Sequence, residues 1–218
     1  MKRRGRKNSL RAGFTLLEML IAVIVLGTTL VSITMTLNSA SGAYEEGQVE
    51  RELDEQDYRA LDAIARELLD AGISQIPVPP TAPLGSESVT YRRATGFDGV
   101  NVLWGSFITV RLELDHGELD DGADNNGNGL VDERMVVWIE NEGQPDERRR
   151  VLTRWVRERM EGELVNGADD NGNGLEDESG LSFELQGNVL ILRLSLERIG
   201  TRGRVVTRTV QTSVRLRN

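Results

Sequence analysis

The chain of 218 residues contains no cysteine and a single histidine. Without cysteine the fold has no disulfide bond and no thiolate metal site, and a cysteine nucleophile is excluded. The one histidine, His116, stands beside Asp115 in a turn-like stretch. A lone histidine is more often a surface residue than a general base. Because the nucleophile elbow, the P-loop and the dinucleotide-binding fingerprint are also missing, we do not expect an enzyme.

Proline and aromatic residues are scarce, and their positions are informative. Four of the five prolines lie within residues 76–86, IPVPPTAPLGS, which therefore predict a linker or an extended connection. The three tryptophans, Trp104, Trp138 and Trp155, lie in segments that predict strands. We expect them to be core or interface anchors rather than parts of a cofactor site.

Charge is distributed unevenly along the chain. Residues 1–13 hold six of the 26 lysines and arginines and no acid, whereas the rest of the chain holds 20 arginines and all 35 acids. The two parts therefore carry about +6 and −15 charges. A body this acidic repels nucleic acids and anionic lipid surfaces, because phosphate binding requires lysine and arginine. We expect small cations, and no nucleic acid, among its partners.

Residues 14–37, FTLLEMLIAVIVLGTTLVSITMTL, form an apolar run of 24 residues in which Glu18 is the only charge. About 20 apolar residues are enough to cross the hydrocarbon core of a membrane as a helix. The basic leader before the run predicts a cytoplasmic N-terminus. The sequence thus predicts one membrane crossing, with the rest of the chain on the outer side.

The small residue that precedes the apolar run, Gly13, distinguishes it from a signal peptide, whose cleavage site follows the apolar stretch. Cleavage after Gly13 would remove the leader and leave the helix on a chain that begins at Phe14. A carboxylate at membrane depth is costly and usually has a charged partner, although Glu18 near the interface could instead reach water. The new amine of Phe14, one helical turn away, would supply such a partner.

These residues, GFTLLEMLIAV at 13–23, closely resemble the N-terminus of type IV pilins and type II secretion pseudopilins. The resemblance implies that a prepilin peptidase cleaves after Gly13 and methylates Phe14. It also implies that Glu18 pairs with the N-terminal amine of a neighbouring subunit during filament assembly. The implied location is a bacterial inner membrane, with a periplasmic head, and then a pseudopilus or pilus. The closing residues 214–218, VRLRN, resemble the ends of J-type pseudopilins and W-type minor pilins.

Residues 38–75 are expected to continue the helix as an amphipathic segment. Its apolar residues recur at three- or four-residue spacing, namely Val49, Leu53, Ala60, Leu61, Ile64 and Leu68. Gly72 is expected to be the C-cap, and a break near Ser41 and Gly42 is expected to bend the helix.

Residues 76–218 predict a β-rich head, because the period of the apolar residues changes to two. The strands are expected at residues 101–114, 134–140, 149–157, 188–198 and 204–216. In one of them Leu190, Leu192, Leu194 and Leu196 would share a face. The prediction is an α+β, pilin-like fold in which the long N-terminal helix packs on the apolar face of an antiparallel sheet.

One internal repeat interrupts the head: residues 118–133, ELDDGADNNGNGLVDE, return as residues 163–178, ELVNGADDNGNGLEDE. Alternate oxygen-bearing side chains, a turn glycine and two later carboxylates match the first half of an EF-hand calcium loop. Two leucine carbonyls fall at the backbone-ligand position. The candidate ligands are Asp124, Asn126, Asn128, Leu130, Asp132 and Glu133, and Asp169, Asn171, Asn173, Leu175, Asp177 and Glu178.

The EF-hand pattern is incomplete, because Met135 and Gly180 stand where a bidentate glutamate is required. The repeats look more like the Asp/Asn-Gly calcium repeats of secreted bacterial proteins, with Glu133 and Glu178 supplying the missing carboxylates. Alternatively, the Asn-Gly pairs only favour tight turns, which leaves the six acids in each short segment unexplained. We expect structural calcium, since magnesium prefers water and a strict octahedron.

The sequence therefore favours a filament subunit whose partners are the prepilin peptidase, other pilin or pseudopilin subunits and the inner membrane. A minor pseudopilin of a type II secretion system, in the tip complex of its pseudopilus, is the first interpretation. A W-like minor pilin of a type IV pilus is the second. A membrane-tethered calcium-binding adhesin that never assembles is a third, from a different class of protein.

Overall fold

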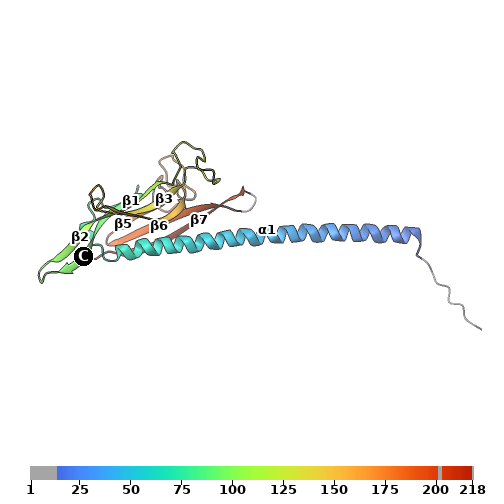
Figure 1. Ribbon diagram of the computed structural model, residues 1–218, viewed down its shortest axis with the longest axis horizontal. Coiled ribbons are helices and arrows are strands. Elements are labelled where there is room, and N and C mark those ends of the chain that lie inside the picture. Colours follow the sequence, from blue (N-terminus) through green and yellow to red (C-terminus); the bar gives the residue numbers. More distant parts are fainter. Residues whose placement is uncertain (1–13, 201–202, 218) are drawn as a thin grey trace, which may run out of the picture. The chain divides into compact units, whose positions relative to one another are not determined.

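The computed structural model describes residues 14–200 and 203–217. One long helix, α1 (Leu16–Leu68), is followed by a short 3₁₀ helix, η1 (Ile73–Gln75), and by seven strands (Figure 1). The strands are β1 (Ser88–Phe97), β2 (Val102–Leu114), β3 (Arg134–Glu140), β4 (Arg148–Val156), β5 (Leu181–Gln186), β6 (Val189–Ile199) and β7 (Val205–Arg215). The chain divides into two compact units, residues 1–44 and residues 45–218. The expected leader, residues 1–13, lies outside the described residues.

The first unit is the apolar part of α1. It contains the one helix among the described residues that is long and apolar enough to cross a membrane, and its large apolar side chains are exposed. The hydroxyls within it donate to carbonyls of the preceding turn, for example Thr29 to Val25 at 2.7 Å and Ser32 to Thr28 at 2.9 Å. Hydroxyls satisfied in this way can enter a bilayer without an unpaired donor.

One expectation about the helix is wrong, and the expected bend near Ser41 and Gly42 stays a prediction. The helix runs without interruption through Ser41 and Gly42, because a single glycine is tolerated where strong helical sequence continues on both sides. It ends at Leu68, and Gly72 is not its C-cap: the backbone of Gly72 is extended (φ −85°, ψ 137°) and precedes η1. Gly72 is required for another reason, since a Cβ atom at this position would collide with the ring of Trp104.

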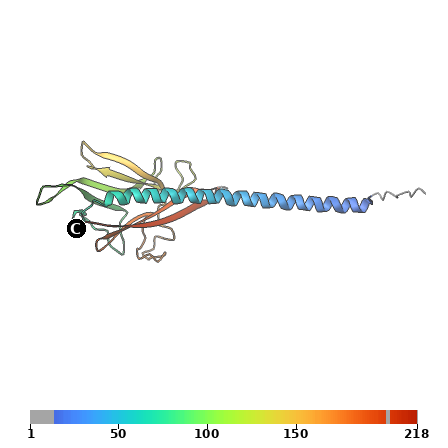
Figure 2. The ribbon, with the colours of Figure 1, turned by 90° about the horizontal axis from the view of Figure 1, so that it is seen from below.

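The second unit is an antiparallel sheet with the rest of α1 laid along it (Figure 2). The strand order is β1-β2-β3-β4-β6-β5, and β7 lies outside this order. It pairs with β6 along the whole length of that strand, from Val189 to Ile199. All five expected strands are present within one or two residues of their expected limits. β1 and β5 were not expected. The α+β, pilin-like arrangement of a long apolar N-terminal helix packed on an antiparallel sheet is confirmed.

The core of this unit lies between the apolar stripe of α1 and the facing side of the sheet. The buried stripe consists of Leu53, Ala60, Leu61, Ile64 and Leu68, and the four alternating leucines of β6, from Leu190 to Leu196, are fully buried against the same cluster. Each fully buried leucine contributes roughly 1.5–3 kcal/mol relative to exposure. The docking of residues 45–68 is therefore part of the fold of the head.

The opposite face of β6 is polar but also buried, because the second acidic repeat covers it. Arg193 pairs there with Glu184 of β5 at 3.0 Å, and both side chains are less than one-tenth exposed. Arg193 also donates to the carbonyl of Asn173 in the repeat at 3.4 Å. β6 is thus the strand that connects the helix-covered core with the acidic loops.

A buried acid interrupts the apolar stripe of α1. Asp57 is four residues from both Leu53 and Leu61, is 0% exposed, and neither carboxylate oxygen has a hydrogen-bond partner. Burial, together with the nearby charge of Asp54, raises the pKa of Asp57 from 3.8 to about 8. The folded head therefore favours the protonated, neutral form of this side chain.

We expect Asp57→Asn to stabilise the protein above pH 4. Below the unfolded pKa both states are protonated and nothing is gained. As pH rises towards the folded pKa of about 8, the wild type loses stability while the asparagine variant does not. Because each pKa unit corresponds to about 1.4 kcal/mol, the gain at pH 8 should reach a few kcal/mol. Urea-unfolding midpoints of both proteins from pH 4 to pH 8 measure it.

The matched control is Asp62→Asn, which removes the same charge from an exposed position of α1 beside Arg66. It should change the pH dependence of the midpoint little, because a solvated pair contributes under about 1 kcal/mol. A difference between Asp57→Asn and wild type that is the same at every pH would contradict the assignment.

Candidate functional sites

The N-terminus of α1 is closed by a reciprocal pair of hydrogen bonds between Thr15 and Glu18. The backbone N–H of Glu18 donates to Oγ1 of Thr15 at 3.2 Å, and the backbone N–H of Thr15 donates to Oε2 of Glu18 at 3.4 Å. Since α1 begins at Leu16, Thr15 is the N-cap and Glu18 the third helical residue, which is a capping box. The Thr-x-x-Glu spacing could have predicted this role from the sequence.

Glu18 therefore has a local function besides the pairing implied by the resemblance. Its carboxylate satisfies an N–H at the positive end of the helix, where negative charge is favourable. Phe14, one residue before the cap, is 78% exposed. Gly13, the residue expected to precede the cleavage site, lies outside the described residues.

The two acidic repeats occupy equivalent places at one end of the sheet. The first connects β2 to β3 and the second connects β4 to β5. The two connections are neighbours, because Arg134 at the start of β3 pairs with Val156 at the end of β4. Matching backbone bonds close their bases, from Asp115 N–H to the Glu133 carbonyl at 3.0 Å and from Met160 N–H to the Glu178 carbonyl at 3.1 Å.

Inside the first loop, the side chains organise the backbone into a tight turn. Asp124 accepts hydrogen bonds from the N–H groups of Gly127 at 2.6 Å and Gly129 at 2.8 Å. The amide of Asn126 donates to Oε1 of Glu133 at 2.7 Å, and the amide of Asn128 donates to the same oxygen. Three expected ligands, two amides and one carboxylate, thus converge on one point.

The second loop repeats this geometry residue for residue. Asp169 accepts from the N–H groups of Gly172 at 2.7 Å and Gly174 at 2.9 Å. The amides of Asn171 and Asn173 both donate to Oε1 of Glu178, the former at 3.0 Å. The two copies therefore agree in three-dimensional arrangement as well as in sequence.

Asp132 and Asp177 bind the loop backbone. Asp132 accepts from the N–H groups of residues 121 and 122 at 3.1 and 2.8 Å, and Asp177 accepts from those of residues 166 and 167 at 2.8–3.0 Å. The N–H donors of residues 166 and 167 lower the pKa of Asp177. Both aspartates have positive φ, 51° and 52°. They fix the entrance of each loop to its exit.

Two further acids, Glu118 and Glu163, were not among the expected site residues. Each is buried and accepts backbone N–H groups from the centre of its loop, Glu118 from Asn126 at 2.8 Å and Glu163 from Asn171 at 2.9 Å. Both repeats begin with a glutamate, and this shared position could have indicated from the sequence that Glu118 and Glu163 belong to the loops. They hold the turn against the head.

Of the other expected ligand positions, Leu130 and Leu175 place their side chains in the protein interior. Met135 lies in β3, and Gly180 lies so close to the Arg157 carbonyl that a Cβ atom would collide with it. Within the described part of the chain, no three His, Cys, Asp or Glu side chains are grouped as a metal site. Each loop instead combines one convergent carboxylate with two amides.

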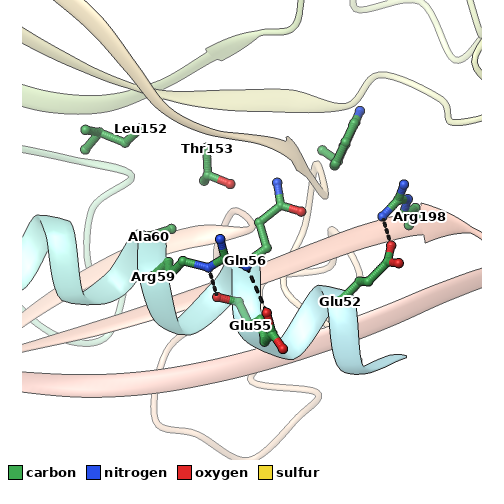
Figure 3. A pocket seen from close by; sticks show the side chains of 9 residues that line it. Glu52, Glu55, Gln56, Arg59, Ala60, Leu152, Thr153 and Arg198 are labelled. Atoms are coloured by element: carbon green, nitrogen blue, oxygen red, sulfur yellow. Dashed lines mark hydrogen bonds and ion pairs between the residues drawn. The ribbon is translucent and has the colours of Figure 1, made fainter. Parts of the chain in front are cut away.

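A groove of about 480 Å³ lies between α1 and β4 (Figure 3). Its arginines are paired, Arg59 with Glu55 at 3.0 Å and Arg198 with Glu52 at 2.6 Å. The groove contains one hydroxyl group, that of Thr153, which lies 3.4 Å from the carbonyl of Arg154. Both arginines of this groove are thus paired with carboxylates of α1.

The family model described as the prokaryotic N-terminal methylation motif matches residues 8–34. The match spans the capping box and the apolar start of α1. No curated protein and no solved structure matches the chain. The motif supports a type IV pilin-like or pseudopilin protein, which is a structural subunit anchored by one membrane helix.

Proposed function

We propose that this protein is a minor pseudopilin of a type II secretion system, cleaved after Gly13 by a prepilin peptidase and assembled into the pseudopilus. The observation that carries the proposal is the methylation motif at residues 8–34, together with a continuous helix whose apolar part bears the single charge Glu18. The head contributes a β-rich unit that includes the second half of that helix.

Assembly follows from the chemistry of the helix. Before assembly its exposed apolar side chains require lipid, and afterwards they require the helices of neighbouring subunits. Cleavage creates a cationic amine at Phe14. In an apolar environment this amine and the Glu18 carboxylate of another subunit would each lack a counter-charge unless they paired. Pairing therefore fixes the axial position of one subunit against the next.

A W-type minor pilin of a type IV pilus is the second candidate, because residues 214–218, VRLRN, resemble the ends of both classes. The two candidates share the N-terminal chemistry and differ in the filament they enter. We favour the first candidate and propose that the subunit enters the tip complex of a pseudopilus.

Deletion of the gene separates these candidates. If the protein is a minor pseudopilin, the deletion strain should retain type II substrates in the periplasm, with surface pili unchanged. The wild-type gene supplied in trans should restore secretion. Loss of surface pili with normal secretion would instead support the pilin, and a strain normal in both would contradict a filament role.

A further inference from the structure

Each acidic loop contains a buried carboxylate with an unpartnered oxygen. Glu133 is 0% exposed and Glu178 is 3% exposed. One oxygen of each accepts from two asparagine amides, while the other, Oε2, has no hydrogen-bond partner. Neither glutamate forms an ion pair with an arginine of the described chain. The same oxygen lacks a hydrogen-bond partner at equivalent positions of both repeats, which indicates a ligand for this oxygen rather than a chance feature of one loop.

The missing partner must be a cation that prefers oxygen. A buried carboxylate supported only by two neutral amides is strongly disfavoured, because the amides do not neutralise its charge. An asparagine amide exchanges the positions of its oxygen and nitrogen by turning about χ2. In each loop that turn would place two amide oxygens beside the glutamate, in exchange for the hydrogen bonds that these oxygens accept from backbone N–H groups of the loop. A cation between the oxygens and the glutamate would complete the ligand set.

We propose that each loop binds one calcium ion, with Glu133 and Glu178 as the carboxylate ligands that close the sites. Asn126 and Asn128 are the amide ligands of the first site, and Asn171 and Asn173 those of the second. Asp124 and Asp169 stand at the first ligand position of the EF-hand spacing, and the Leu130 and Leu175 carbonyls at the backbone position.

The remaining acids are positioning residues rather than ligands. The carboxylates of Asp132 and Asp177 accept backbone N–H groups from the loop entrances, whereas those of Asp124 and Asp169 accept from the turn that carries the asparagine ligands. Glu118 and Glu163 accept N–H groups from the loop centres. The four positioning acids set the backbone so that the asparagines and the closing glutamate face one another.

A polar turn without metal accounts for less of the structure. Turns of this kind need the aspartate, asparagine and glycine residues, and their side chains make the expected bonds to the backbone. They do not need a glutamate buried with a free oxygen. Calcium fits better than magnesium, because its coordination is larger and less strict in geometry.

Equilibrium dialysis of the full-length protein in detergent against radioactive calcium tests the proposal. Wild type should bind two ions per chain, with dissociation constants on the order of 10⁻⁴–10⁻³ M. Glu133→Gln and Glu178→Gln should each bind one ion, and the double variant none. Equimolar magnesium should displace little of the bound calcium.

Glu176→Gln is the matched control, because it makes the same chemical change two residues from Glu178 at a side chain outside the convergent set. It should bind two ions. Wild type that binds no calcium would overturn the proposal, as would single variants that still bind two. Circular dichroism verifies that each variant is folded. If a variant does not fold, the number of calcium ions bound by wild type still tests the proposal.

Discussion

Replacing Glu18 by alanine should leave cleavage after Gly13 intact and reduce incorporation of the subunit into the filament about a hundredfold or more. Removing one partner of a buried ion pair costs about 3–5 kcal/mol, because the other charge is left unpaired. A loss of that size corresponds to at least two orders of magnitude in the association equilibrium. Immunoblots of membrane and sheared filament fractions, normalised to processed protein, measure the effect.

The capping box provides the decisive control. Glutamine can replace glutamate in a capping box, so Glu18→Gln keeps the hydrogen bond from Thr15 and removes only the charge. If Glu18 acts by pairing with a neighbour's amine, the glutamine variant should fail to assemble as completely as the alanine variant. Normal assembly of Glu18→Gln would show that capping alone is needed, and normal assembly of both variants would contradict the pairing role of Glu18. Wild type and both variants that all stay in the membrane fraction, with none in filaments, would favour a tethered adhesin.

Removing calcium should lower the melting temperature of the full-length protein in detergent by about 10 °C. At a ligand concentration 100 times the dissociation constant, one site stabilises the folded state by about 2.7 kcal/mol. Two weaker, partly filled sites together should contribute on the order of 3–5 kcal/mol. For a chain of this size each kcal/mol corresponds to about 2–4 °C. Thermal melts in 10 mM calcium and in excess chelator measure the difference.

The double variant Glu133→Gln with Glu178→Gln should respond in the opposite direction. In calcium it should melt below wild type, because its sites are empty. In chelator it should melt at or above wild type, because it no longer buries two uncompensated carboxylates. Identical melts of wild type with and without calcium would contradict a stabilising role for the loops.

The parts of the structure that sequence reasoning predicted are those with a strong local pattern. The apolar run, the three- and four-residue stripe from Leu53 to Leu68 and the alternating leucines of β6 each specify one element and one buried face. The repeat at residues 118–133 and 163–178 predicted two equivalent loops because identical side chains make identical local bonds.

The parts that were missed depend on contacts between distant segments. β1 carries Arg92 and Arg93, which interrupt its apolar alternation and are stabilised by Phe107 and by Glu67 of α1. β5 carries Glu184, whose burial is possible only beside Arg193. The sequences of β1 and β5 by themselves therefore do not indicate which residues of other elements will pair with their charged side chains.

The burial of Asp57 was missed although a local signal was present in the sequence. Asp57 falls on the apolar stripe by its spacing from Leu53 and Leu61, so its burial could have been predicted. The roles of Asp132 and Glu133 could not be separated by spacing, since both follow the turn glycine closely. The positive φ of Asp132 decides which carboxylate faces the backbone and which faces the asparagines.

The mass of the N-terminal peptide of the mature protein, purified from its native membrane, tests the central claim most directly. The account predicts a chain that begins at Phe14 and carries one methyl group on its amine. A chain that still bears residues 1–13, or one cleaved after the apolar run so that Glu18 is lost, would contradict assembly through a prepilin-type N-terminus.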